Sequence, residues 1–416
     1  MPNSILTNKN APGIVAKLAA KMLADNLQFC KLIDKADESD FGGKNGFSSG
    51  DTIYVSKPPR FIAGTNRDVT SAIQDVNDEK AALTLNVSST VAIALTSNEI
   101  ATDLALKNWA DRILRQAVNT IAHNVESRFL TAAVNSVADY VGSPTVTAFD
   151  TDTMLAAGER LSNMLCPDDD MRYALLTPRA QRNAVNARKG LFQQSDEIGK
   201  QYVRGAMGRA DGFEYYSNNL LPLLTAGTAT VASNATTADL VSGTSTISVN
   251  GLTGSGTVTA GTVFTVAGVN AVHPITKADL GYLQPFVVTA NATASSGVAT
   301  LSVYPTPQGP LTGGLQNITT LATSGAVVTF LSNTAASQAT RQNLMFHKSA
   351  FRMASVPLVM PGGVDMAAQE TVDNITIRVI RDYEVLTDRL IMRLDFLGGI
   401  VPVRPEWAVR LPNTNN

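Results

Sequence analysis

In Ala260-Gly261-Thr262-Val263-Phe264-Thr265-Val266-Ala267-Gly268-Val269, apolar and hydroxyl residues alternate close to two glycines. The surrounding block, Ala226 to Met345, contains only four charged residues: Asp239, Lys277, Asp279 and Arg341. Similar alternating runs occur at 246–249, 285–289, 299–303 and 327–331, with Gly251, Gly281 and Gly297 near their ends. Short strands separated by regular turn signals predict a small closed sheet or barrel.

The sequence on either side of this block predicts one α/β domain. Before the block we expect a helix at 151–163, a strand at 172–176 and a helix that Pro178 opens. After it, charge returns beyond Gln342 and strands are expected at 375–380 and 390–394. The block is therefore predicted to be an insertion between two halves of a single domain.

The first 150 residues predict an arm, a long hairpin and a spine helix. Residues 11–34 have helical spacing, with apolar positions at Ile14, Leu18, Met22 and Phe29. Strands at 51–57 and 83–95 are joined by more than twenty polar residues, a loop length that is usually functional or disordered. Thr96-Ser97-Asn98-Glu99 is a capping box. The apolar stripe behind it is Ile100, Leu104, Leu114, Val118, Ile121, Val125 and Phe129.

The composition of the 416 residues is 44% hydrophobic and 16% charged, with a net charge of −2. This charge gives no electrostatic footprint for tight nucleic-acid binding. Cys30 and Cys166 lie among apolar residues, which favours buried free thiols over a disulfide. We expect neither a signal peptide nor a membrane-spanning segment, and hence a protein that is made in a cytoplasm.

Enzymatic sites are not favoured by the pattern of reactive residues. His123 and Glu126 have a His-x-x-Glu spacing, but no second His or Cys accompanies them, so a surface or interface histidine is preferred. Asp168 to Asp170 lack the spacing of a calcium loop and are interpreted as a solvated turn. No nucleophile elbow, Walker loop or dinucleotide fingerprint occurs. We predict no enzyme, no metal and no cofactor.

Three stretches of the sequence combine glycines, strands and turns in a characteristic order. The first is Gly205 to Phe213 followed by Tyr215 to Pro222, the second is Ala260 to Val269, and the third is Asp388 to Gly399 followed by Arg404 to Trp407. The residues that carry this signature are Gly205, Gly208, Gly212, Pro222, Gly398, Gly399, Arg404, Pro405 and Trp407. In their order along nearly the whole chain, these stretches resemble the major capsid proteins of tailed bacteriophages, of the short-tailed type with an inserted β-barrel.

The resemblance implies an α+β Hong-Kong-97-type fold with an inserted all-β barrel. The implied parts are 1–47 (N-terminal arm and helix), 48–95 (extended hairpin and peripheral strands), 96–149 (spine helix and peripheral domain), 150–225 (first part of the axial domain), 226–345 (inserted barrel) and 346–416 (axial and peripheral return and C-terminus). The candidates for inter-subunit contacts in the hairpin are Lys57, Arg60, Arg67, Asp68, Asp75, Asp78 and Glu79.

The function that the resemblance implies is self-assembly into the icosahedral head, procapsid and then mature capsid, of a virion. The expected partners are further copies of the chain in pentamers and hexamers, a scaffolding protein, a portal ring and enclosed double-stranded DNA, with no membrane. Some members of the wider fold crosslink their subunits through Lys–Asn isopeptide bonds, for which Lys57 and Lys80 are possible donors. Non-covalent contacts are favoured for the type with an inserted barrel.

Two other classes of protein remain open from the sequence. The Thr- and Ala-rich block is also compatible with an adhesion or carbohydrate-binding module of a virion, although aromatic residues such as Tyr282, Phe286 and Tyr304 are sparse. An unrecognised hydrolase is the other, although no nucleophile and base have motif spacing.

Overall fold

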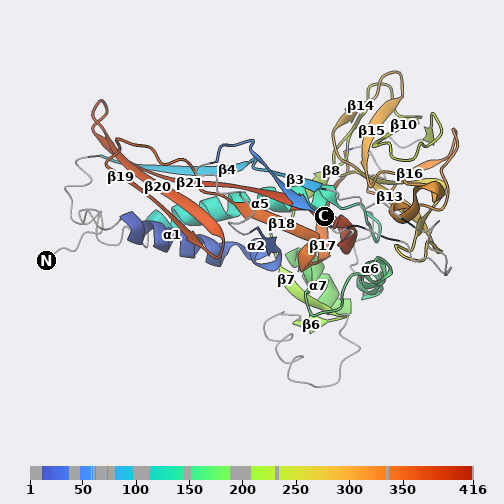
Figure 1. Cartoon of the computed structure of the whole chain (residues 1–416), viewed down its shortest axis with the longest axis horizontal. Helices are drawn as coiled ribbons and strands as arrows, with labels where there is room; N and C mark the ends of the chain where they lie inside the picture. Colours follow the sequence, from blue (N-terminus) through green and yellow to red (C-terminus); the bar gives the residue numbers. More distant parts are fainter. Residues whose placement is uncertain are drawn as a thin grey trace. The chain divides into compact units, whose positions relative to one another are not determined.

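The computed structural model describes residues 12–36, 47–57, 59, 61, 73, 80–96, 113–144, 151–187, 208–229, 234–332 and 337–414. These residues form a mixed α+β structure that is rich in strands, as predicted (Figure 1). The chain divides into two compact units. Unit 1 comprises Met1–Val55, Lys80–Leu130 and Phe351–Val403, and unit 2 comprises Ser56–Glu79, Thr131–Ala350 and Arg404–Asn416. Within the described part of the chain, no helix is both long and apolar enough to cross a membrane.

Unit 1 is built on a six-stranded sheet with the order β1-β18-β21-β20-β19, in which β4 also pairs with β21. Its strands are β1 (Asp34–Lys35), β4 (Val87–Thr96), β18 (Phe351–Ser355), β19 (Met366–Val372), β20 (Ile375–Glu384) and β21 (Arg389–Pro402). We expected the strands at 375–380 and 390–394 to return to the α/β domain. They belong to this sheet instead, because β21 is long enough to pair with β20, β4 and β18 along its length.

The N-terminal helices cover this sheet with small side chains. Helix α1 (Pro12–Asn26) begins at a proline and contacts β19 and β20, and α2 (Gln28–Leu32) follows it. Of the predicted stripe, Phe29 in α2 is buried, Leu18 and Met22 are only half-buried, and the Ile14 side chain is outside the described part of the structure. The buried face of α1 consists of Val15, Ala16, Ala19, Ala20, Leu23 and Ala24. Alanines let a helix backbone approach a sheet closely, which explains why the largest side chains do not mark this face.

The spine helix α5 (Arg115–Ser136) buries the face that its apolar spacing predicts. Leu114, in the turn just before it, and Val118, Ile121, Val125 and Phe129 are fully buried. The Phe129 ring packs edge-on against Phe396 of β21, with centroids 6.3 Å apart. Thr96 ends β4, and the remainder of the predicted capping box, Ser97 to Glu99, lies outside the described residues together with Ile100 and Leu104.

The predicted hairpin strands pair with one another as β2 (Thr52–Ser56) and β3 (Lys80–Thr84). Ile53, Val55, Ala81 and Leu83 are their buried positions. Of the residues that join the two strands, only Lys57, Pro59, Phe61 and Ile73 are described.

Unit 2 contains an α/β sheet that takes strands from both sides of the low-charge block. Its order is β22-β17-β5-β7-β6, and β8 also pairs with β17. The strands are β5 (Arg172–Leu176), β6 (Arg209–Ala210), β7 (Phe213–Ser217), β8 (Leu223–Thr225), β17 (Ala339–His347) and β22 (Ala408–Thr414). Helices α6 (Thr151–Asn163) and α7 (Pro178–Ala187) lie where the sequence predicts them, and α6 buries Met154, Ala157 and Leu161.

The low-charge block forms its own six-stranded sheet, ordered β16-β12-β13-β15-β10-β9. The strands are β9 (Ala235–Thr236), β10 (Thr246–Asn250), β12 (Val263–Val272), β13 (Asp279–Val288), β15 (Ala299–Tyr304) and β16 (Val328–Phe330). A smaller pair consists of β11 (Thr257–Val258) and β14 (Ala292–Thr293). All five strands predicted for this block are present. The rings of Phe264, Phe286 and Phe330 meet in its core.

The two edges of this sheet are joined to one another. Ala235 and Val327 form an isolated antiparallel bridge, which links β9 to the segment that leads into β16. The Thr236 amide donates to the Ala326 carbonyl and the Val328 amide to the Asn234 carbonyl, both at 2.9 Å. One residue pair and its flanking hydrogen bonds thus link the two ends of the strand order.

The block leaves and re-enters the α/β sheet at adjacent strands. Thr225 at the end of β8 pairs with Ala339 at the start of β17, and the Ala226 amide donates to the Gln338 carbonyl at 2.8 Å. The chain thus departs and returns at one point of the sheet. This geometry permits an insertion without interruption of the strand pairing on either side of it.

Candidate functional site

Of the His-x-x-Glu pair on the spine helix, only Glu126 makes a buried structural contact. His123 is exposed, whereas Glu126 is only 2% exposed and accepts hydrogen bonds from the Gln28 and Phe29 amides at 3.0 and 3.1 Å. These are the first amides of α2, whose positive end favours a carboxylate. Across the described ranges, no group of three or more His, Cys, Asp or Glu side chains is placed to hold a metal ion.

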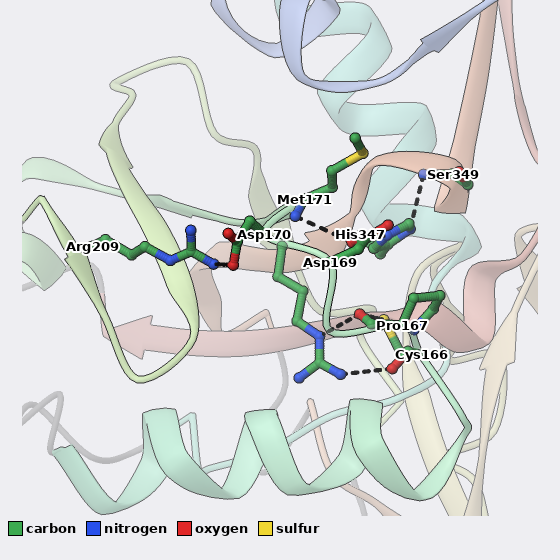
Figure 2. Close-up of polar contacts among 9 residues, drawn as sticks. Cys166, Pro167, Asp169, Asp170, Met171, Arg209, His347 and Ser349 are labelled. Atoms are coloured by element: carbon green, nitrogen blue, oxygen red, sulfur yellow. Dashed lines mark hydrogen bonds and ion pairs between the residues drawn. The ribbon is translucent and has the colours of Figure 1, made fainter.

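The aspartate turn before β5 is held by two buried side chains (Figure 2). Arg172 donates from Nε to the Pro167 carbonyl at 2.9 Å and from Nη2 to the Cys166 carbonyl at 2.6 Å. His347 Nδ1 accepts a hydrogen bond from the Ser349 amide, so its Nε2 carries the proton that it donates to Asp169 Oδ1 at 3.0 Å. Asp170 pairs with Arg209. The turn thus joins β5, β6 and β17, and the carboxylates of Asp169 and Asp170 bind protein groups.

The titration of these groups follows from their surroundings. Desolvation acts to raise the pKa of Asp169, but hydrogen bonds from His347 and the Met171 amide outweigh it and lower the pKa below 3.8. Burial raises the pKa of the Cys166 thiol to about 11. Burial also raises the pKa of Cys30. Both cysteines are free and buried, as predicted, and the thiol form is therefore the stable one near neutral pH.

Arg410 joins the block, the α/β sheet and the end of the spine helix. Its side chain is fully buried in β22. Nη1 donates to the Gly261 carbonyl at 2.8 Å and to the Val137 carbonyl at 3.3 Å, while Nη2 donates to Gln342 Oε1 at 3.2 Å. Burial lowers the pKa of the guanidinium to about 10, so it stays charged at neutral pH. Each acceptor belongs to a different segment, so one cation connects three parts of unit 2.

A second buried polar group is Asp139, in the segment that follows α5. Asp139 is 7% exposed, and burial raises its pKa from 3.8 to about 7, against the attraction of Arg160 and with the repulsion of Glu406. The Arg160 guanidinium, on α6, stacks on the Tyr282 ring of β13, 3.3 Å from the centroid. Burial also raises the pKa of Tyr282 to about 12. The protonated, neutral form of Asp139 is thus favoured in the folded chain below pH 7.

Replacement of Asp139 with asparagine is expected to remove a pH dependence of stability. The folded state retains a proton that the unfolded chain releases between pH 4 and 7, so the free energy of unfolding falls as pH rises through this window. At about 1.4 kcal/mol per pKa unit, D139N should be more stable than the unaltered chain by about 2 to 4 kcal/mol at pH 8. At pH 4 the free energies of unfolding of D139N and the unaltered chain should be equal. Denaturant unfolding at pH 4, 6 and 8 measures this, and a difference that does not vary with pH contradicts it.

The signature residues are structural, and most of them are described. Gly208 and Gly212 have φ values of +59° and +80° around the β6–β7 turn, and Gly205 lies outside the described residues. The Pro222 carbonyl accepts from the Gln342 amide at 3.2 Å. Pro405 opens the 3₁₀ turn η5 (Pro405–Trp407).

The remaining signature residues, Gly398, Gly399, Arg404 and Trp407, take part in close packing. A Cβ on Gly398 would lie 2.7 Å from the Ala354 carbonyl, and one on Gly399 would overlap the Thr84 carbonyl. Trp407 donates from Nε1 to the Met164 carbonyl at 3.1 Å, and the Arg404 guanidinium stacks on its ring. The two glycines thus bring neighbouring strands together, and the tryptophan fixes the end of α6.

Of the candidate contact residues of the hairpin, only Lys57 lies among the described residues, so their use in contacts stays a prediction. Lys57 is half-buried just after β2. Arg60, Arg67, Asp68, Asp75, Asp78 and Glu79 lie outside the described residues. Sequence reasoning also missed two features: the buried Arg410, and an exposed apolar pair, Val385 and Leu386, between β20 and β21. The signal for the latter was present as two adjacent apolar residues in an otherwise polar turn.

The sequence matches the family described as P22 coat protein, gene protein 5, over residues 48–412. A comparison with curated proteins gives no match. A solved structure from Mycobacterium phage Che8 is similar, at 11% identity and a TM-score of 0.47, covering 92% of this chain and 90% of that one. The capsid structure of cyanophage P-SCSP1u gives 12% identity, a TM-score of 0.42 and the same coverage. The CUS-3 coat protein I-domain is 21% identical with a TM-score of 0.20, covering 25% of this chain and 99% of that domain.

The buried polar side chains described above fasten segments of the chain to one another. The family match covers most of the sequence and decides the class of protein. The chain belongs to the P22 coat protein family. It is a major capsid protein, whose copies associate with one another to form the head of a bacteriophage.

Proposed function

We propose that the chain assembles into an icosahedral procapsid that later matures, in the cytoplasm of the host bacterium. Assembly is guided by a scaffolding protein and nucleated at a portal ring, and the shell then encloses double-stranded DNA. The observation that carries this proposal is the family match over residues 48–412. Closed shells need heterologous contacts that complete rings of five and six subunits. Each contact should be weak, about 4 kcal/mol, so that wrong additions dissociate, and many together make the shell durable.

The enclosed DNA is held without sequence recognition. A net charge of −2 on 416 residues gives no general attraction for phosphates, and only four charged residues occur between Ala226 and Met345. A wall that surrounds DNA needs little affinity for it. We infer that the low-charge block does not face the DNA.

The low-charge block acts as an inserted barrel that braces the subunit. Its joined edges, its own apolar core and its departure and return at adjacent strands support this role. Val263 and Val287 of the block pack with Ala138 and Tyr140, which follow α5. We propose the bounds 226–345 for this barrel and keep the bounds expected for the other five segments. We also propose that the extended hairpin between Lys57 and Leu83 reaches a neighbouring copy.

The guided-assembly proposal is tested by comparison of particle sizes. The full chain expressed with the scaffolding protein of its own phage should form shells of one diameter, and the chain alone should form shells of several diameters. Analytical ultracentrifugation measures both distributions. Identical particle-size distributions in the presence and absence of the scaffolding protein would contradict the proposal that this protein guides assembly. The absence of any particle in both would remove self-assembly.

An adhesion or carbohydrate-binding role is less well supported. Phe286, one of three aromatic candidates for an exposed platform, is fully buried. Tyr282, a second candidate, is half-buried, and the Arg160 guanidinium stacks on its ring. A binding platform needs exposed aromatic faces. We therefore retain the capsid role alone.

A further inference from the structure

The turn between β20 and β21 exposes two apolar side chains beyond the rest of its sheet. Val385 is 81% exposed and Leu386 is 94% exposed, the two highest values for large apolar residues in the described part of the chain. The first residue of β19 pairs with Arg381, and the last residue of β4 pairs with Arg389. Residues 382–388, the hairpin tip, therefore extend past both flanking strands (Figure 1).

The hairpin tip is braced by its own side chains. The Tyr383 hydroxyl donates to Asp388 Oδ1 at 2.5 Å, and the Thr387 hydroxyl donates to Glu384 Oε2 at 2.6 Å. The Tyr383 amide donates to Asp382 Oδ1 at 2.9 Å. A turn that is rigid in this way keeps its apolar side chains exposed to solvent. It also loses little conformational entropy when it binds a partner. An isolated subunit gains nothing from this arrangement, so it points to association.

The same sheet carries a surface of complementary character. Val359 and Met360 are 58% and 41% exposed. The Val359 carbonyl accepts from Arg378, which also binds Asp395, and Arg393 binds the same carboxylate through Nε at 2.7 Å. We call Val359, Met360, Arg378 and Arg393 the receptor patch. Because its two arginines share the single carboxylate of Asp395, the patch carries a net positive charge.

The hairpin tip has the opposite charge. Asp382, Glu384 and Asp388 flank its apolar pair in the sequence. Of the two arginines beside the tip, Arg381 is paired with Asp365, so Arg389 is the other nearby cation. Apolar residues in an acidic collar match an apolar patch with excess arginine. A subunit cannot satisfy its own patch, because Glu384 lies six residues along a continuous strand from Arg378, roughly 20 Å at ~3.4 Å per residue.

We propose that the hairpin tip of one subunit docks on the receptor patch of a second copy of this chain, with Val385 and Leu386 against Val359 and Met360. Because the tip and the patch are different surfaces, the contact is heterologous and propagates from one copy to the next, as a closed shell requires. The inference rests on the self-assembly of the coat protein and specifies one of its contacts.

A pair of introduced cysteines tests both the site and the partner. The two native cysteines are buried, so a bifunctional maleimide has few competing targets. In assembled particles, L386C combined with M360C should give a ladder of linked multimers on a denaturing gel, and each single variant should give almost none. Shells of the double variant without a ladder overturn the proposal. A dimer from L386C alone, which would mean that tips meet tips, overturns it as well.

A charge substitution supplies an independent measurement. L386D should raise the subunit concentration needed for assembly by about ten-fold or more, because the apolar contact is lost and a carboxylate replaces it. Its thermal unfolding should be unchanged. V241D, at a residue that is 58% exposed in the low-charge block, is the matched control and should assemble at the unaltered concentration. Normal assembly of L386D contradicts the docking. Failure of the unaltered chain to assemble contradicts the capsid function itself, so the two failures are distinguishable.

Discussion

Replacement of Arg410 with alanine should lower the free energy of unfolding by about 3 to 5 kcal/mol. The side chain is fully buried, and its removal leaves a cavity and deprives the Gly261 and Val137 carbonyls and the Gln342 amide oxygen of a donor. Buried acceptors without a partner retain the full cost of lost hydration. The effect should be large because the acceptors that Arg410 connects belong to three different segments.

The measurement is denaturant unfolding of R410A, with two comparison variants. R410M fills most of the volume without a charge and should lose less stability than R410A, since the cavity is smaller while the carbonyls remain unpaired. R209A removes an exposed ion pair with Asp170 and should change stability by less than about 1 kcal/mol. A loss below 1 kcal/mol for R410A would mean that the block is not braced through this residue.

Gly399→Val should strongly destabilise unit 1. Any Cβ at this position of β21 overlaps the Thr84 carbonyl oxygen and lies 2.9 Å from Leu83 Cδ2. A backbone carbonyl cannot rotate away as a side chain can, so β3 must move and the buried residues of the hairpin strands separate from Leu397 and Val401. Overpacking of this kind costs about 3 kcal/mol.

The matched control is Gly362→Val, since no atom lies within 4 Å of a Cβ there and its φ is not positive. That variant should remain within about 0.5 kcal/mol of the unaltered chain. Both unfolding free energies can be measured in one denaturant series. Equal stability of the two variants would show that β3 and β21 tolerate separation.

The fold was most predictable where local signals agree. Pro178 fixed the start of α7, and the spacing of Val118, Ile121 and Val125 identified the buried face of the spine helix. The alternating runs of the low-charge block identified its five main strands. In each case the polar and apolar periodicity matches one type of secondary structure, so local sequence is sufficient.

The errors arose where packing between distant segments decides the outcome. The buried face of α1 depends on alanines, which carry little hydropathy signal. The pairing of β21 depends on β4, which lies before the spine helix and far from β21 in the sequence, and no local pattern encodes that choice. Arg410 follows Val409 and precedes Leu411, so alternation along the strand would place it on a solvent face.

Electron microscopy of the purified full-length protein tests the central claim most directly. The capsid assignment predicts closed, hollow shells above a threshold protein concentration. Monomers or small discrete oligomers at every concentration, from a preparation that unfolds cooperatively, would contradict it.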